Sequence, residues 1–210
     1  MTIRKGVPWG QTVPSPTDLL VVPTDRDARE FVVGQRLRQA EHRGALRPLG
    51  LGGGDLARTM GGGHDRFPGM VTEAPIDLLR VQSGERVTWA VAHVIARRRW
   101  WSGEVLFAMN AQFLSQHGRC YDVAPRSHPN DGKVDIVHVS ADMRRRARHA
   151  AARRARTGTH LPHPQLMASQ VSELAVTFER PLVLWVDGRR WGTARDLSIA
   201  VEPDALIVYA

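Results

Sequence analysis

The sequence predicts a mixed fold, in which a shortened α/β domain over residues 1–75 is followed by a β-sandwich domain over residues 76–210. Two patterns carry this prediction. Between residues 18 and 59, apolar runs flank a helical stretch and lead into a glycine-rich turn, which is the order of an α/β unit. Beyond residue 76, many short apolar segments are joined by turn residues, which is typical of a β-sandwich. A chain of 210 residues is long enough to form a real core.

The first domain is expected to open with an irregular arm over residues 1–16, because prolines and glycines interrupt it throughout. The apolar run 18–22 predicts a buried parallel strand. Residues 27–42 predict a helix with acidic residues near its start, where they suit the helix dipole. Residues 48–51 predict a second strand, and the glycines at 52–54 then turn the chain into another helix.

The second domain is expected to consist mainly of short strands. Its predicted strands cover residues 87–96, 105–109, 134–139, 171–178, 181–186, 197–201 and 205–209. Turn residues such as Asp187-Gly188 separate several of these strands. We expect the last strands to pack back against the first domain.

One helix interrupts these strands over residues 142–156, with Asp142 as its N-cap. Its apolar stripe is thin and consists mainly of alanine. Arginine covers the rest of its surface, at Arg144, Arg145, Arg146, Arg148, Arg153, Arg154 and Arg156. The helix is either a solvated element that packs through its alanines or one that lies against an anionic surface.

The net charge is +8, and nearly all basic residues are arginine, since only Lys5 and Lys133 are lysine. The planar guanidinium suits phosphate recognition, but charge alone does not choose among nucleic acid, a lipid headgroup and no anionic partner. Cys120 is the only cysteine, which excludes an internal disulfide and indicates a reducing compartment. Because there is no apolar signal core or membrane-spanning run, we expect a cytoplasmic protein that is at most peripheral to a membrane.

A proline-rich loop over residues 124–133 leads into the predicted strand 134–139. Within it, Asn130-Asp131-Gly132 predicts a tight turn, because Asn and Asp bond their own backbone and Gly accepts a positive φ. Asp131 therefore either forms an Asx-turn or supplies a carboxylate to a hard cation.

Three other features are weaker candidates for a site. His160 and His163 resemble a metal-ligand pair, but the adjacent prolines exclude a helical face and disfavour a zinc site. Trp100-Trp101 either stack on nucleobases or belong to the rim of the core. Cys120 lies in no recognisable nucleophile motif.

Four segments together resemble a known family: residues 110–113 (Asn-Ala-Gln-Phe), 123–125 (Val-Ala-Pro), 129–135 (Pro-Asn-Asp-Gly-Lys-Val-Asp) and 183–188 (Val-Leu-Trp-Val-Asp-Gly). Their order and spacing resemble the C-terminal domain of the diacylglycerol kinase catalytic family, which also contains sphingosine and other lipid kinases. Residues 50–58 resemble the family's Gly-Thr-Gly-Asn-Asp motif, and residues 74–81 resemble its strand that crosses into the second domain. The resemblance implies a truncated α/β nucleotide-type domain followed by a β-sandwich of the diacylglycerol kinase type.

The family phosphorylates a lipid hydroxyl with ATP and magnesium. A glycine-rich loop that opens a helix can hold phosphate on its backbone N–H groups. The residues that the resemblance places at the nucleotide phosphates are Asp25, Gly52, Gly53, Gly54, Asp55 and Arg58. It also implies that Asp131 holds a structural Mg²⁺ ion, with backbone carbonyls near His128 and Lys133 as further ligands.

The sequence departs from the family pattern at the positions that carry nucleotide binding and phosphoryl transfer. The family's Gly-Gly-Asp-Gly-Thr nucleotide loop corresponds to residues 23–27, where Asp25 remains but every glycine is lost and Pro23 has no N–H to donate. The family's base is a Glu after Asp-Gly, whereas this chain has Asp187-Gly188-Arg189, and a guanidinium cannot accept a proton. Only residues 1–17 precede the first predicted strand, so we expect the family's two leading βα units to be absent. These losses disfavour ATP binding and leave the catalytic residue unknown.

The sequence therefore predicts a diacylglycerol kinase-like protein that is non-catalytic or strongly altered and binds a lipid or a phosphorylated ligand. Two alternatives remain: an active ATP-dependent lipid kinase with a rearranged site, and an arginine-rich nucleic-acid-binding protein. A lipid or an anionic membrane surface is the expected partner, ahead of nucleic acid. The sequence leaves the ligand and the oligomeric state open.

Overall fold

The computed structural model describes residue 3 and residues 8–39 and 46–210. Its helices are α1 (Asp25–Gln39), α2 (Gly54–Thr59) and α3 (Arg145–Arg154), with short 3₁₀ turns at His64–Arg66 and Ala155–Thr157. Its strands are β1 (Gln11–Pro14), β2 (Val21–Val22), β3 (Leu49–Leu51), β4 (Met70–Ser83), β5 (Arg86–Ala90), β6 (His93–Arg97), β7 (Val105–Met109), β8 (Phe113–Gln116), β9 (Arg119–Asp122), β10 (Val134–Val139), β11 (Leu166–Val171), β12 (Glu173–Val186) and β13 (Arg189–Tyr209).

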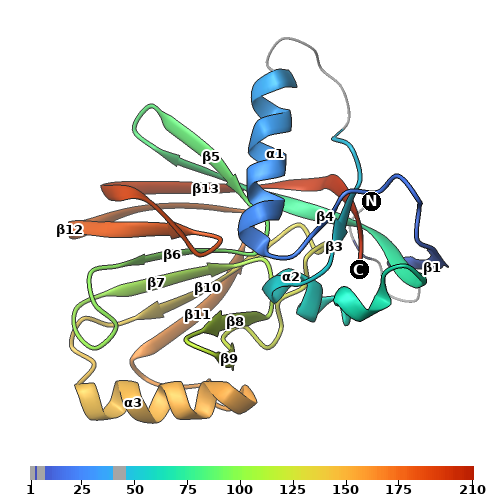
Figure 1. The fold of residues 1–210 in the computed structure, drawn as a ribbon. Coiled ribbons are helices and arrows are strands. Elements are labelled where there is room, and N and C mark those ends of the chain that lie inside the picture. The colour runs from blue at the N-terminus through green and yellow to red at the C-terminus, as the bar shows by residue number, and fades with distance from the viewer. Residues whose placement is uncertain (1–2, 4–7, 40–45) are drawn as a thin grey trace.

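A single hydrogen-bonded sheet connects most of these strands, in the order β1-β4-β13-β12-β6-β7-β10-β11. These neighbours pair antiparallel, while β3 runs parallel to both β2 and the end of β13. The hairpin β8–β9 forms a separate two-stranded sheet. Figure 1 shows α1 and α2 near the parallel strands and α3 beyond the hairpin, at the opposite end of the molecule.

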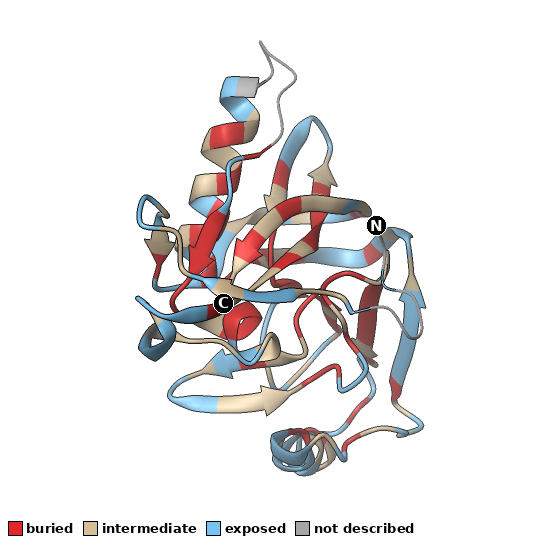
Figure 2. Ribbon diagram, turned by 90° about the vertical axis from the view of Figure 1, so that its right-hand side faces the viewer, coloured by how far each residue is buried: buried red, intermediate tan, exposed pale blue. Residues whose placement is uncertain are grey.

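The core has three parts, which Figure 2 shows as buried segments inside the sheet and beneath the helices. One apolar cluster lies between α1, α2 and the strands β2, β3, β4 and β13. A second fills the interior of the sheet, where Phe178, Leu184 and Ile199 are almost fully buried. The third lies between the outer face of β6, β7 and β10 and the layer made by α3 and the β8–β9 hairpin. The sheet therefore buries apolar side chains on both faces, as a sandwich requires.

The predicted fold class is confirmed: a short α/β part precedes a β-sandwich-like part. Strands β7 and β10 have the predicted bounds, and β3 differs from its prediction by one residue. Along β10, Val134 and Ile136 enter the sheet interior whereas Val137 and Val139 face α3, as the alternating pattern requires. The predicted helix 27–42 corresponds to α1, but its last residues lie outside the described part of the chain. The domain division at residue 76 stays a prediction, because β4 and the sheet run across it.

Several predicted strand boundaries are wrong, and each has a tertiary cause. Residues 87–96 form two strands, because the backbone breaks at Val91–Ala92 to reach a buried carboxylate. The strands on either side of Pro181 are one continuous β12, with a register shift between Thr177 and Leu182 that absorbs the proline. The strands on either side of Pro203 form one β13, with a similar shift between Glu202 and Leu206.

Other elements were not predicted. The arm contains β1, which pairs with β4 at the edge of the sheet. The hairpin β8–β9 and strand β11 were also missed. Strand β11 exposes most of its side chains, and its apolar residues do not alternate with polar ones. Helix α3 begins at Arg145, and Arg144 rather than Asp142 occupies the N-cap position without a side-chain cap.

Arg148 lies on the inner side of α3 and is buried, unlike the solvated arginine that the sequence suggested. Its guanidinium donates hydrogen bonds to the carbonyl oxygens of Met143, Trp100, Gly103 and Ser140. It therefore ties the start of α3 to the loop between β6 and β7. Among the described residues, every helix is too short or too polar to cross a bilayer.

We predict that Arg148→Met lowers the free energy of unfolding by about 3 kcal/mol, because it leaves buried carbonyl oxygens without donors. The matched control is Arg145→Met on the exposed side of α3, with an expected change within about 0.5 kcal/mol. Urea denaturation of both variants measures the difference. Equal stability of the two variants would contradict the role given to Arg148.

Candidate functional site

A cavity of about 770 Å³ lies where the start of α1, the start of α2, β6, hairpin β8–β9 and the β12–β13 turn meet. Its lining combines acidic, basic and aromatic side chains: Asp25, Asp55, His93, Asp187, Arg26, Arg97, Trp100 and Trp185, with Leu114, Gln116 and His117 from the hairpin. Several of these residues are more than 60 positions apart in sequence, so only folding brings them together.

Asp25 is the first residue of α1, and its carboxylate caps the next helix. Its two oxygens accept hydrogen bonds from the backbone N–H groups of Asp55 and Leu56, at 2.6 and 3.1 Å. A Cβ added to Gly54 would lie 2.4 Å from this carboxylate, and one added to Gly53 would lie 2.5 Å from the carbonyl oxygen of Pro23. Both glycines are therefore needed so that α2 can approach the start of α1 closely.

Asp187 is buried in the turn between β12 and β13. Asp187 and Gly188 have φ angles of 46° and 75°, as a two-residue Asp-Gly hairpin requires. The carboxylate accepts hydrogen bonds from the N–H groups of Val91, Ala92 and His93, each at 2.9 Å. The break between β5 and β6 thus supplies donors to Asp187.

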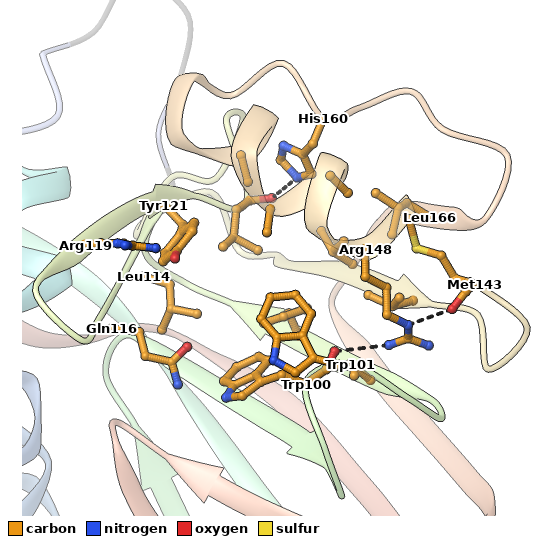
Figure 3. A pocket seen from close by; sticks show the side chains of 18 of the residues that line it. Trp100, Trp101, Leu114, Gln116, Arg119, Tyr121, Met143, Arg148, His160 and Leu166 are labelled. Atoms are coloured by element: carbon orange, nitrogen blue, oxygen red, sulfur yellow. Dashed lines mark hydrogen bonds between the residues drawn. The ribbon is translucent and has the colours of Figure 1, made fainter. Parts of the chain in front are cut away.

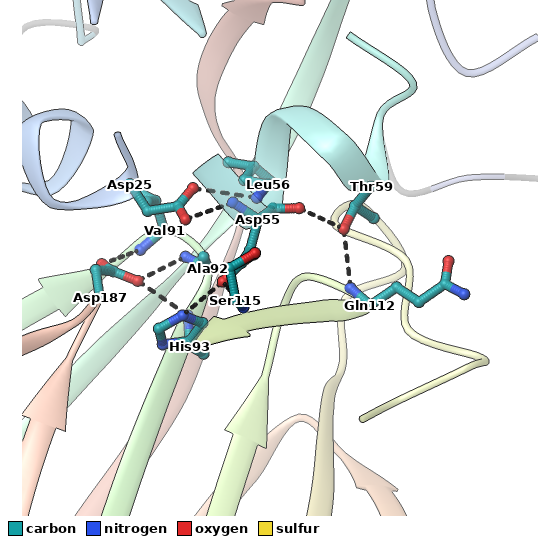
Figure 4. Close-up of polar contacts among 10 residues, drawn as sticks. All are labelled: Asp25, Asp55, Leu56, Thr59, Val91, Ala92, His93, Gln112, Ser115 and Asp187. Atoms are coloured by element: carbon teal, nitrogen blue, oxygen red, sulfur yellow. Dashed lines mark hydrogen bonds and ion pairs between the residues drawn. The ribbon is translucent and has the colours of Figure 1, made fainter. Parts of the chain in front are cut away.

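His93 and Asp55 form a buried pair between these two carboxylates (Figure 4). His93 Nε2 lies 3.3 Å from Asp55 Oδ2, which also accepts a hydrogen bond from the N–H of Ser115. His93 Nδ1 and Asp55 Oδ1 are buried and have no hydrogen-bond partner.

Burial and mutual charge shift the pKa of every member of this cluster. Burial alone would lower the pKa of His93, but Asp55, Asp187 and Asp25 outweigh burial and raise it. Burial raises the pKa of Asp25 to about 6 and also raises the pKa of Asp187. Burial opposes ionisation of Asp55, but hydrogen bonds from His93 and Ser115 lower its pKa overall. The acids around His93 therefore favour its protonated form.

The predicted phosphate-binding residues are placed as follows. The N–H groups of Asp55 and Leu56 at the start of α2 are occupied by Asp25, and that of Gly52 donates to the carbonyl of Val22. Arg58 is exposed in the last turn of α2 and does not line the cavity. A phosphate role for these residues stays a prediction, and one that would require Asp25 to move.

Among the described side chains, Asp25, Asp55 and His93 are the group whose ligand atoms lie close enough to share a metal, within 4.8 Å of one another. Hydrogen bonds already engage both oxygens of Asp25 and one oxygen of Asp55. One uncommitted carboxylate oxygen beside an imidazole is a poor match for Mg²⁺, which prefers six oxygen ligands.

The loop predicted to hold structural magnesium is organised by a different carboxylate, Asp77 of β4. Asp77 accepts hydrogen bonds from Asn130 Nδ2 and from the N–H groups of Gly132 and Asp204. Asp131 accepts from the N–H of Lys133, which is an Asx-turn.

A magnesium ion at Asp131 with the carbonyls near His128 and Lys133 stays a prediction. Burial raises the pKa of Asp131, so its carboxylate does lie in a partly enclosed place. Sequence reasoning missed Asp77, although a single acid inside the apolar run of β4 is the signal that could have found it.

Arg189, at the family's base position, points toward α1. Its Nη1 forms an ion pair with Glu30 Oε1 at 2.6 Å, and both side chains are about half exposed. It does not line the 770 Å³ cavity. Among the residues described, Asp25 and His93 are titratable side chains that line the cavity and have raised pKa values, and sequence reasoning treated His93 only as a strand residue.

A second, apolar cavity of about 500 Å³ opens beside the first, between α3, the β8–β9 hairpin and the outer face of β7 and β10. Figure 3 shows Trp100, Trp101, Leu114, Tyr121, Met143 and Leu166 around it. His160 is buried in its wall, and its Nε2 forms a hydrogen bond with the carbonyl oxygen of Val123. This contact gives His160 a structural role and does not form a zinc ligand set. Four residues line both cavities: Trp100, Leu114, Gln116 and His117. The two cavities therefore adjoin.

Comparison with known proteins identifies a matching family. Residues 81–210 match the family described as the YegS C-terminal NAD kinase beta sandwich-like domain. A search of curated protein sequences finds no match.

Two solved structures from Bacillus anthracis str. Sterne, each assigned as a diacylglycerol kinase, are similar in fold. The first has a TM-score of 0.66 at 11% identity, and the second has a TM-score of 0.59 at 13% identity. Each alignment covers 91% of this chain and 77% of the other chain. At this identity the likeness shows the fold, and the comparisons give no support to a nucleic-acid-binding protein.

The buried acids predict an unusual dependence of stability on pH. The folded state binds a proton on Asp25 more tightly than the unfolded state, since its pKa rises from 3.8 to about 6. The resulting stabilisation, about 3 kcal/mol, is complete below pH 3.8 and is lost as the pH rises through about 6. The raised pKa of His93 also makes the free energy of unfolding fall with rising pH, at pH values above its ordinary pKa of 6.5.

We therefore expect the free energy of unfolding to fall as the pH rises from about 4.5 to 7, and Asp25→Asn to flatten that dependence. Urea denaturation across this range measures the slope. The control is Asp65→Asn, whose carboxylate is exposed, and its slope should equal that of the parent. An Asp25→Asn protein with the parent's slope would show that Asp25 is not the titrating group.

Proposed function

The chain belongs to the family of the YegS C-terminal NAD kinase beta sandwich-like domain, and on that premise we propose that it is a diacylglycerol kinase-like protein that binds a lipid without phosphorylating it. The observation that carries this proposal is the apolar cavity of about 500 Å³ that adjoins the polar one. A lipid has one apolar and one polar end, and the paired cavities offer a place for each.

The apolar cavity is large enough to hold a ligand, since ligand pockets measure about 300–1,000 Å³. Its walls come from β7, β9, β10 and small residues of α3 and the 3₁₀ turn that follows it, namely Ala151, Ala152 and Ala155. Small residues on the inner face of α3 leave this space open, whereas a helix with leucine at these positions would fill it. The alanine stripe thus acquires a function beyond helix packing.

Three features support binding without phosphoryl transfer. Transfer depends on donors that hold and stabilise the phosphates. The N–H donors at the start of α2 are occupied by Asp25. Pro23 provides none, and Arg189 is paired with Glu30 rather than facing the cavity. These engaged donors leave the phosphates of Mg-ATP with little support at the start of α2, which favours binding without transfer.

We predict that the protein binds monooleoylglycerol and that Ala152→Phe, which fills the apolar cavity, weakens binding at least tenfold. The matched control is Ala150→Phe, one of the exposed residues of the same helix, which should bind like the parent. Displacement of a fluorescent fatty-acid probe gives both affinities. Equal weakening by the two substitutions would place the lipid elsewhere.

We also predict that radiolabelled phosphate is not transferred from Mg-ATP to diacylglycerol, monoacylglycerol or sphingosine, and that Arg189→Glu does not restore transfer. The new carboxylate would lie beside Glu30, away from the cavity. Turnover near 1 s⁻¹, on the order expected of kinases, would instead identify a rearranged active site.

We propose an anionic bilayer as the partner that supplies the lipid. The exposed side of α3 carries Arg145, Arg146, Arg153 and Arg154. Beside it, the ring of Trp101 is 42% exposed and stacks on His149 at 3.9 Å. Tryptophan suits the interface between headgroups and acyl chains, and each basic residue near an anionic surface contributes about 1 kcal/mol. Trp101 lines the apolar cavity and α3 forms one of its walls, so a lipid from this surface would have a short path into it.

If an anionic bilayer is the partner, the protein should co-sediment with phosphatidylserine-containing vesicles but not with vesicles of pure phosphatidylcholine. Its binding should fall steeply at high salt. Replacing the four exposed arginines of α3 with glutamine should abolish pelleting. The control is Arg38→Gln with Arg47→Gln, two exposed arginines in and shortly after α1, which lies at the opposite end of the molecule from α3. Equal pelleting with both vesicle types, or tight binding to duplex DNA at physiological salt, would reject the membrane as the partner.

A further inference from the structure

Arg97 occupies the boundary between the two cavities. It is the last residue of β6, and its guanidinium carbon lies 4.0 Å from the ring centroid of Trp100 and 5.2 Å from that of Trp185. Trp100 lines both cavities. The two indole rings hold the guanidinium by cation–π contact, which fixes its position without using its N–H donors.

At this corner of the cavity, which Arg97 and Trp185 form, two N–H donors have no acceptor. Arg97 Nε and Trp185 Nε1 are buried, and neither has a hydrogen-bond partner. In the part of the chain that the structure describes, no carboxylate forms an ion pair with Arg97, whereas Arg26, Arg36 and Arg189 are all paired. Burial lowers the pKa of Arg97, and no neighbouring charge contributes to that shift.

The acidic residues that line the same cavity do not accept hydrogen bonds from Arg97 or Trp185. Asp25 and Asp187 direct their oxygens to backbone N–H groups, and Asp55 directs one oxygen to His93 and Ser115. A guanidinium stays charged at neutral pH and can only donate. Buried donors of this kind are ordinarily paired, so an unpaired Arg next to an unpaired indole N–H marks a place for an external acceptor.

We propose that Arg97, with Trp185 Nε1, binds the oxyanion of a phosphate monoester headgroup whose acyl chain enters the apolar cavity. The inference rests on the proposed function, because it assigns the headgroup of that same lipid. The planar fork of arginine matches two phosphate oxygens, and the indole N–H offers a donor in the same wall. A free phosphate ester carries the same chemistry without the tail, so the two sources must be separated by experiment.

Three probes separate them: oleoyl lysophosphatidic acid, monooleoylglycerol and glycerol phosphate, each titrated calorimetrically below the critical micelle concentration. We expect lysophosphatidic acid to bind at least tenfold more tightly than monooleoylglycerol, and glycerol phosphate to bind weakly. Arg97→Gln should remove the advantage of the phosphate and leave monooleoylglycerol binding unchanged. Its matched control is the exposed neighbour Arg98→Gln, which should keep the advantage.

A second variant guards against loss of folding in Arg97→Gln. Trp185→Phe keeps an aromatic ring but removes the indole N–H, and it should lower the affinity for lysophosphatidic acid alone. If either variant weakens both oleoyl lipids equally, the corner is structural and the proposal is overturned. It is also overturned if glycerol phosphate binds as tightly as lysophosphatidic acid, since the ligand is then a free phosphate ester.

Failure of the proposed function has a different signature. If neither oleoyl lipid competes for the apolar cavity, the lipid-binding function fails. Glycerol phosphate binding that is lost in Arg97→Gln would then still support an anion site at this corner, although not one for a lipid.

Discussion

Buried carboxylates that accept hydrogen bonds from backbone N–H groups hold this molecule together. Asp187 receives three such bonds from the break between β5 and β6, and Asp25 receives two from the start of α2. Each joins segments that the chain does not connect locally. A buried charge is tolerated only when it is paired or hydrogen-bonded, so the positions of the break, the glycines and the helix start depend on these two side chains.

The same contacts also organise the start of α2, where the sequence motif suggested a phosphate-binding loop. A helix N-terminus attracts an anion, and here the anion is Asp25 itself. The glycines before α2 serve that internal contact, because a Cβ on Gly53 or Gly54 would meet Pro23 or Asp25. An acid from the neighbouring helix thus occupies the place where the sequence motif suggested phosphate.

The unsatisfied groups of the site are therefore mainly donors rather than acceptors. Each oxygen of Asp25 and Asp187 accepts a hydrogen bond and Asp55 Oδ1 accepts none, whereas the donors Arg97 Nε and Trp185 Nε1 have no partner. These donors lie where the polar cavity meets the apolar one. The two adjoining cavities thus form an amphipathic pocket whose polar end suits an anion.

The sequence by itself determined the fold class, the strands β7 and β10, the Asx-turn at Asp131 and the family, because these follow from local periodicity, turn chemistry and motif order. Only the tertiary structure decided the site. In sequence, His93 is one residue of a predicted strand, Arg97 directly follows that strand, and Asp77 is an acid in an apolar run. Burial and contacts with distant residues gave them their roles. Arg148 resembles its exposed neighbours in sequence, yet it is buried against four carbonyls. Burial, the gap left by small residues and the presence of an acceptor all depend on contacts between segments far apart in the chain, which local patterns do not record.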